Sequence, residues 1–217
     1  MPSSRKALDR ALKTYRIGTV PLFATLADLG EKNVERLLGL YRRDEQVRTL
    51  PYVGKRKLYT LTARGAKRLG LDPRKHRRAP MFQTIANDLL IATFCAEHKQ
   101  QLLLPSEFAE MLPDLAALPG YTRRYFIDTD GTLSLIVPDF GMRARELARR
   151  ARGAVNERKE RFDAWKKLIY PRAFRIYVVT PYGERKAKLI EKHLSIDTFP
   201  HVVARVRLEE LFPARSK

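Results

Sequence analysis

The sequence has one cysteine, no long apolar run and none of the glycine-rich loops that cradle phosphate groups. Because Cys95 is the only cysteine among 217 residues, an internal disulfide is impossible and a cysteine-rich zinc module is excluded. No apolar run approaches the roughly 20 residues that cross a bilayer, and the first 15 residues lack the apolar centre of a signal peptide. We therefore expect a cytoplasmic protein with no membrane partner.

Motifs of common enzyme chemistry are also missing. Neither a phosphate-binding glycine loop nor a G-x-S-x-G nucleophile motif occurs, so nucleotide hydrolysis and esterase chemistry have no support. Cys95 and His98 have a spacing that metal ligands can use, but no other Cys or His lies near them in sequence. We interpret them as a buried thiol and a surface histidine, and we expect no cofactor and no metal.

Positive charge is what the sequence has in excess. The formal net charge is +19 and the pI is about 10.3, which favours a polyanion, above all nucleic acid, as partner. Residues 1–80 hold 20 Lys and Arg against 7 Asp and Glu, and the remaining residues hold 23 against 17. The front part is therefore the expected DNA-binding face, and the 44% of apolar residues are enough for a folded core.

The stretch EKNVERLLGLYRRDEQVRTLPYVGKRKLYTLT, residues 31–62, predicts a recognition helix followed by a wing. Val34, Leu37, Leu38 and Tyr41 recur at helical spacing and predict one buried face. Residues 47–50 and 57–61 then predict two strands, joined by a turn with cations at its tip. The expected DNA-binding residues are Lys32, Asn33, Arg36, Arg42, Arg43, Arg48, Lys55, Arg56 and Lys57.

Two further helices precede this stretch. Ser3 or Ser4 caps a helix through Tyr15, and Gly18 is expected to stop it. Thr19 and Pro21 then start a second helix, and Thr62 caps a fourth one after the wing. Residues 1–72 thus predict a winged helix-turn-helix domain, residues 73–80 a basic, proline-bounded linker, and residues 81–217 an α/β layered domain.

The back half predicts alternating helices and strands. Residues 81–100 predict a helix buried in a second core, and the prolines of residues 105–119 break the next stretch into pieces that cannot be placed. Asp130 and Gly131 between apolar runs predict a hairpin of residues 125–128 and 133–137. A long helix over residues 142–169, a strand at 174–179, a helix through 194 and a strand at 201–206 follow. The fold class is therefore α+β.

Asn33 and Arg36 are the expected base-reading residues. They lie near the start of the helix, where side chains reach base edges in the major groove. Asn can pair bidentately with adenine and Arg with guanine, while the other cations contact phosphates. The alternative is that the cations are merely solvated on a small helical domain. Glu31 and Glu35 on the same helix favour that alternative.

The long helix carries many cations on its expected wet faces. Solvation alone would explain them, but a second polyanion contact or an acidic protein partner is the competing hypothesis, because acids there are fewer than half the cations. The cations are Arg143, Arg145, Arg149, Arg150, Arg152, Arg158, Lys159, Arg161, Lys166 and Lys167.

A metal-dependent nuclease of the PD-(D/E)xK type is a competing hypothesis for the back domain. It needs strand-borne acids and a lysine to hold a divalent ion and activate water. The candidate acids are Asp139, or Asp114 with Asp128 and Asp130, and neither register supplies the lysine. We expect Asp128 and Asp130 to be hairpin-turn residues and Asp139 to be a helix cap.

Residues 15–70 resemble the amino-terminal winged helix of the plasmid replication-relaxation proteins, which are accessory DNA-binding factors of mobile elements. The Leu-Thr-x-x-Gly at Leu61, Thr62 and Gly65 carries part of this resemblance. It implies a winged helix fused to a nuclease-like α/β fold, here a degenerate one, because the acid-rich strand motif is reduced to Asp128 and Asp130.

The sequence as a whole predicts a double-stranded DNA-binding accessory protein of a bacterial plasmid or mobile element, acting in replication, mobilisation or its control without catalysis. The back domain is expected to form a homodimer or to dock a protein partner. The alternatives are a winged-helix transcriptional regulator and, from another class, a metal-dependent nuclease.

Overall fold

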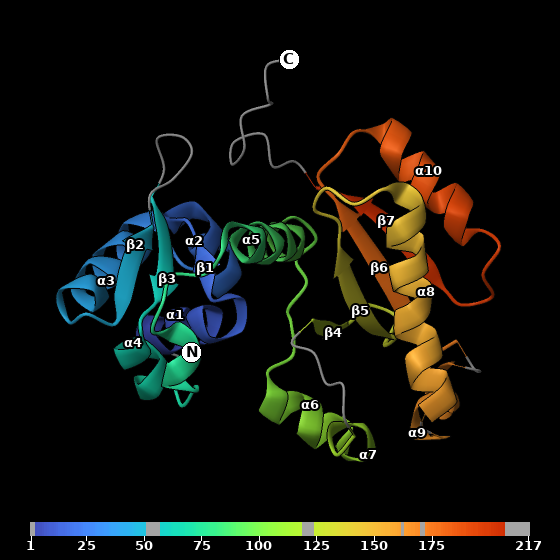
Figure 1. Cartoon of the computed structure of the whole chain (residues 1–217). Coiled ribbons are helices and arrows are strands. Elements are labelled where there is room, and N and C mark those ends of the chain that lie inside the picture. Colours follow the sequence, from blue (N-terminus) through green and yellow to red (C-terminus); the bar gives the residue numbers. More distant parts are fainter. Residues whose placement is uncertain (1–2, 51–56, 119–123, 162, 170–171, 207–217) are drawn as a thin grey trace. The chain divides into compact units, whose positions relative to one another are not determined.

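The chain is an α+β protein with two compact units. The computed structural model describes residues 3–50, 57–118, 124–161, 163–169 and 172–206. The first unit extends to Lys99, and the second unit is Gln100–Val206. The first consists of helices with a small antiparallel sheet, and the second of a mixed four-stranded sheet with helices (Figure 1). Among the described residues, no helix is long and apolar enough to cross a bilayer.

The first unit has a three-stranded antiparallel sheet in the order β1-β3-β2. Its strand β1 was not predicted, because a strand of two residues leaves no periodicity in the sequence. In chain order the elements are α1 (Ser4–Tyr15), β1 (Ile17–Gly18), α2 (Val20–Ala27), α3 (Glu31–Arg43), β2 (Val47–Leu50), β3 (Leu58–Leu61), α4 (Ala63–Arg68), the 3₁₀ turn η1 (Pro73–His76) and α5 (Phe82–Glu97).

The helix starts of the first unit follow the predicted caps. The side chains of Ser3, Thr19 and Thr62 accept hydrogen bonds from backbone N–H groups in the first turns of α1, α2 and α4, which satisfies donors that a helix leaves open. The expected stop at Gly18 is wrong. Helix α1 ends at Tyr15 because Arg16 turns into the left-handed region at φ 63°, and Gly18 lies in β1.

The connection after α4 is packed rather than free. The Arg48 guanidinium on β2 donates to the backbone carbonyls of His76 and Arg77, and α5 packs against α1, α2 and β1. The expected boundary at residues 73–80 therefore lies inside the first unit, and the helix expected in a second core belongs to the first. An all-round apolar helix shows from sequence that it is buried, but not which core it joins.

The Leu-Thr-x-x-Gly motif has a structural role. The backbone carbonyl of Gln46 accepts hydrogen bonds from the Thr62 N–H at 3.0 Å and from the Thr62 hydroxyl at 3.1 Å. A Cβ atom at Gly65 would lie only 2.0 Å from this carbonyl oxygen, so only glycine fits there. The motif thereby fixes the start of α4 against the turn between α3 and β2.

Replacing Gly65 by alanine is expected to lower the free energy of unfolding by about 1–3 kcal/mol or more, since the added methyl group must push backbone apart. Urea unfolding measures this change. Gly39→Ala is the matched control, because a Cβ at Gly39 meets nothing within 4 Å. In a helix interior the same substitution is expected to stabilise by about 0.5–1 kcal/mol. Equal effects at both positions would contradict the steric argument.

The second unit has the strand order β4-β5-β6-β7, with β4 antiparallel to β5 and the other pairs parallel. The predicted hairpin and both later strands are confirmed. The long helix is described as α8 and α9, on either side of position 162, which lies outside the described residues. The elements are α6 (Pro105–Met111), α7 (Pro113–Ala116), β4 (Tyr125–Ile127), β5 (Leu133–Pro138), α8 (Ala144–Arg161), α9 (Asp163–Ile169), β6 (Phe174–Thr180), α10 (Glu184–Leu194) and β7 (His201–Arg205).

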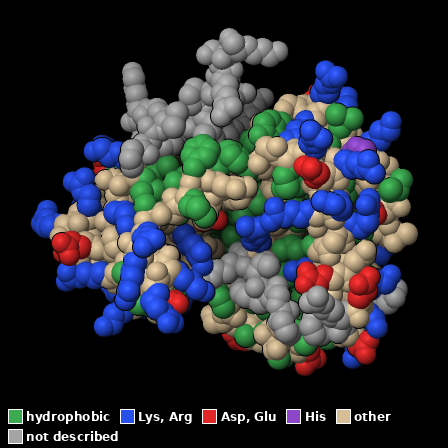
Figure 2. Space-filling model, in the orientation of Figure 1, with side chains coloured by type: hydrophobic (Ala, Val, Ile, Leu, Met, Phe, Trp, Pro, Cys, Tyr) green, Lys and Arg blue, Asp and Glu red, His purple; other side chains and the backbone are tan. Residues whose placement is uncertain are grey.

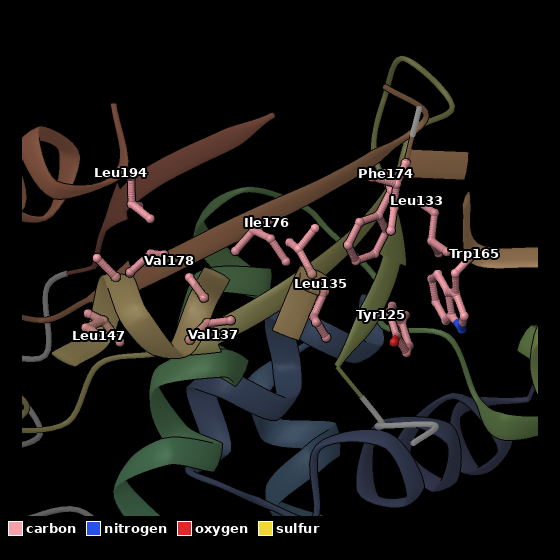
Figure 3. Packing of buried hydrophobic residues seen from close by; sticks show 14 of the residues in the cluster. Tyr125, Leu133, Leu135, Val137, Leu147, Trp165, Phe174, Ile176, Val178 and Leu194 are labelled. Carbon is pink, nitrogen blue, oxygen red and sulfur yellow. The ribbon is translucent and has the colours of Figure 1, made fainter. Parts of the chain in front are cut away.

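One face of this sheet forms the core of the second unit (Figure 3). Alternate residues of β5 and β6 share that face, because side chains alternate along a strand, and all of them are buried. Leu147 on α8, Trp165 on α9 and Leu194 on α10 pack into the same cluster. The strand residues are Leu133, Leu135, Val137, Phe174, Ile176 and Val178.

Candidate nucleic-acid interface

Helix α3 presents one buried and one exposed face. Val34, Leu37, Leu38 and Tyr41 are buried, as predicted. The turn from α2 places Asp28 in the left-handed region at φ 52° and uses Gly30 as the N-cap. On the opposite face Asn33 is half-buried, and the exposed polar residues are Glu31, Lys32, Glu35, Arg36, Arg42 and Arg43.

The two expected base-reading residues are bonded to each other. The Arg36 guanidinium donates from Nη2 to the Asn33 amide oxygen at 3.1 Å. This bond does not use the Asn33 amide N–H₂ group or the other guanidinium donors, which can therefore bond to other acceptors. The pair therefore presents a surface made mainly of hydrogen-bond donors.

Three cations of α3 have no carboxylate partner in the part of the chain that the structure describes. Lys32 lies in the first turn, and Arg42 and Arg43 lie in the last turn, where cations also interact favourably with the helix dipole. Figure 2 shows Lys and Arg side chains spread over the visible face of the first unit, with few Asp and Glu among them. An external polyanion could therefore contact both ends of α3.

The predicted wing is described only in part. Strands β2 and β3 pair antiparallel, with Val47 opposite Leu61, and Lys57 is exposed just before β3. Lys55 and Arg56 lie outside the described residues. Arg48, which was expected to contact phosphate, has its guanidinium donating to two carbonyls of the chain. Sequence reasoning could not separate this cation from the others on the hairpin.

A polar triad fixes α3 against its neighbours, and no local pattern in the sequence indicates it. The Tyr41 hydroxyl donates to Asp9 at 2.8 Å. Two nitrogens of Arg68 donate to the same carboxylate at 2.7 and 2.6 Å, and the Arg68 guanidinium lies 4.6 Å from the centre of the Tyr41 ring. The triad joins α1, α3 and α4, and it uses the carboxylate of Asp9 inside the fold.

Burial, and then the neighbouring Asp9 carboxylate, raises the pKa of Tyr41 to about 12. A pKa above the ordinary value of 10 means that the folded state holds the phenolic proton more tightly. The protonated Tyr41 hydroxyl therefore contributes to the free energy of unfolding. This contribution is fully present below pH 10 and is lost as pH rises through about 12.

The Tyr41→Phe variant is therefore expected to lose less stability than the natural protein between pH 10 and pH 12. Urea unfolding at stepped pH measures the difference between the two proteins. Tyr182→Phe is the control, because Tyr182 is 38% exposed. The explanation by Tyr41 fails if the natural protein and Tyr41→Phe lose stability in parallel.

The cations of α8 and α9 do not all face solvent. Arg158 is buried, contrary to expectation, and donates from Nε to the Tyr125 hydroxyl at 2.8 Å. Arg152 forms an ion pair with Asp197 at 2.5 Å, and Lys166 forms one with Asp163 at 2.6 Å. Of the other expected cations, Lys159 is half-buried, the side chain at position 161 lies outside the described ones, and the exposed cations are Arg143, Arg145, Arg149, Arg150 and Lys167.

The hairpin acids of the second unit are engaged by an arginine. Arg175 on β6 donates from its two terminal nitrogens to Asp128 and to Asp130, each at 2.7 Å. Tyr177 also donates to Asp128. Hydrogen bonds from Thr132, followed by the bond from Arg175, hold the pKa of Asp130 at about 2. Both acids lie at the hairpin turn, as expected.

Asp139 was expected to cap a helix, and that prediction is wrong. The residue follows β5, whereas α8 begins five residues later at Ala144. Its carboxylate is fully buried, accepts from the Thr180 hydroxyl at 2.8 Å and pairs with the Lys186 ammonium at 2.7 Å. Within the described ranges, no three His, Cys, Asp or Glu side chains are grouped so that they could hold a metal ion.

Comparisons with protein-family models, with curated proteins and with solved structures found no match. Function has to be argued from the residues and their geometry.

Proposed function

We propose that the chain binds double-stranded DNA and that its first unit is a winged helix-turn-helix. The element order α1-β1-α2-α3-β2-β3 and the sheet order β1-β3-β2 support this assignment. In such a domain α2 and α3 form the helix-turn-helix, and the β2–β3 hairpin is the wing. The second helix of the motif enters the major groove.

The observation that carries the proposal is the exposed face of α3. Its amino-terminal half presents the bonded pair Asn33 and Arg36, and its last turn presents Arg42 and Arg43 without carboxylate partners in the described chain. A major groove admits one helix, with base edges at its floor and phosphates along its rims. Each good bidentate contact to a base contributes about 1–3 kcal/mol of discrimination.

Glu31 and Glu35 also lie on this face, and both are exposed. A glutamate beside a phosphate is unfavourable, but a glutamate at the groove floor can accept a hydrogen bond from cytosine N4. We therefore propose that these two glutamates contact bases. The phosphate contacts are made by Lys32, Arg42, Arg43 and Lys57.

We assign no catalysis to the second unit, whose finer fold we propose to be a degenerate PD-(D/E)xK nuclease fold. Its sheet offers little to a metal-dependent nuclease. Strand β5 reads LSLIVP and has neither an acid nor a lysine. Asp139, which directly follows it, already pairs with Lys186, and Arg175 already pairs with Asp128 and Asp130. A role in dimerisation or in docking a protein partner fits these residues better.

The resemblance of the front part to plasmid replication-relaxation proteins suggests an accessory role in replication or mobilisation of a mobile element. A transcriptional regulator with the same DNA-binding face is the second candidate. Mapping of bound DNA across the host genome separates the two, because a regulator would be confined to promoters. Magnesium-dependent strand cleavage that is abolished in Asp128→Ala would replace both with a nuclease.

The combined substitution of Lys32, Arg42 and Arg43 by glutamine is expected to weaken binding to duplex DNA. The dependence of log affinity on log salt should also become shallower, by about 0.9 for each phosphate that the variant no longer neutralises. Fluorescence anisotropy at several salt concentrations measures both quantities.

The control replaces Arg185, Lys188 and Lys192 on α10 by glutamine, which removes the same net charge from the second unit. If both triple variants change the affinity and the salt slope equally, binding is a response to net charge alone and the assignment to α3 is wrong.

A further inference from the structure

The first unit contains a small cavity of about 80 Å³, and three cations and one carboxylate are among the residues that line it. Strands β1 and β3 supply Ile17, Thr60 and Leu61, and the other lining residues come from the position after α1, from η1 and the segment after it, and from the first turns of α5. None of its residues is among those proposed above to contact DNA. The polar side chains are Arg16, Thr60, Lys75, His76, Arg78, Thr84 and Asp88.

Arg16 combines two unfavourable features at this cavity. It holds a left-handed backbone conformation at φ 63°, which costs an L-residue with a long side chain free energy that glycine would not lose. Its Nε atom is also fully buried and has no hydrogen-bond partner among the residues that the structure describes. A buried N–H of a charged group without an acceptor is strongly unfavourable. Arg16 also lines the cavity, so its guanidinium lies beside any acceptor that binds there.

The surrounding charge favours an anion as that acceptor. Lys75 and Arg78 add two further cations, while Asp88 is the one carboxylate of the lining and already has an interaction within the protein. Thr84 lies in the first turn of α5, whose N-cap residue Met81 makes no side-chain capping bond. The N–H groups at the start of a helix carry partial positive charge and bind anions.

We propose that this cavity binds a phosphate group. Its volume of about 80 Å³ exceeds the roughly 10–15 Å³ that one water needs, so a tetrahedral oxyanion of five heavy atoms fits its scale. Arginine supplies several charge-assisted donors to such an ion. The phosphate has two sources with the same chemistry, a small phosphate compound in solution or the backbone of nucleic acid bound to the protein.

The test follows thermal unfolding of the full chain in sodium phosphate, against sodium chloride of equal ionic strength. Phosphate is expected to raise the Tm beyond the effect of chloride, because a ligand of the folded state stabilises it. Arg16→Asn, which keeps a residue that tolerates the left-handed backbone, and Arg78→Gln should each bind phosphate about tenfold more weakly or worse.

Arg77→Gln is the matched control, since Arg77 is exposed and its side chain does not line the cavity. It should respond to phosphate as the natural protein does. The proposal is overturned if phosphate gives no more stabilisation than chloride, or if Arg16→Asn and Arg78→Gln respond like the natural protein. Because these measurements contain no DNA, they stand or fall separately from the proposed function.

Equilibrium dialysis with labelled inorganic phosphate and duplex DNA lacking terminal phosphates distinguishes the two sources. Displacement of the label by DNA, together with weaker DNA binding by Arg78→Gln, identifies the nucleic-acid backbone as the source. Undiminished binding of the label on the DNA complex identifies a small phosphate compound. Either result supports the cavity as a phosphate site.

Discussion

The pairing of carboxylates with cations inside the fold determines where the excess positive charge of this chain remains. Asp9 holds Arg68, Asp139 holds Lys186, and Asp197 holds Arg152, each at 2.7 Å or less. These pairs join elements far apart in the sequence. The acids that make them are used for structure, so they do not neutralise the outer face of α3, whose terminal cations have no carboxylate partner in the described part of the chain.

Acceptors inside the protein also determine which single arginines stay exposed, although these arginines look alike in the sequence. Arg48 was expected on phosphate and instead binds two backbone carbonyls of the 73–80 segment. Arg158 was expected in water and instead lies in the core against the Tyr125 hydroxyl. An arginine has an apolar stem and five donors, so composition shows how many arginines a chain has, but not which of them the fold uses.

Local signals predicted most of the first unit. The structure confirms the apolar spacing of α3, the three capping side chains and the paired strands β2 and β3. Each of these features depends on residues that are close together in the sequence. The Asp9–Arg68 bond joins residues 59 positions apart, and no local rule reports it. Strand β1 and the packing of α5 were missed for the same reason: both depend on tertiary contacts.

Arg175 gives the strongest physical argument about catalysis in the second unit. A divalent cation needs several carboxylate oxygens that are not already bound to another cation. Here the guanidinium of Arg175 donates a hydrogen bond from one nitrogen to Asp128 and from the other to Asp130. A metal ion would have to displace this arginine from two charge-assisted bonds, with Tyr177 still donating to Asp128. The Arg175 guanidinium therefore occupies the two carboxylates that a nuclease would use to bind a metal ion. For this reason we favour DNA binding over cleavage.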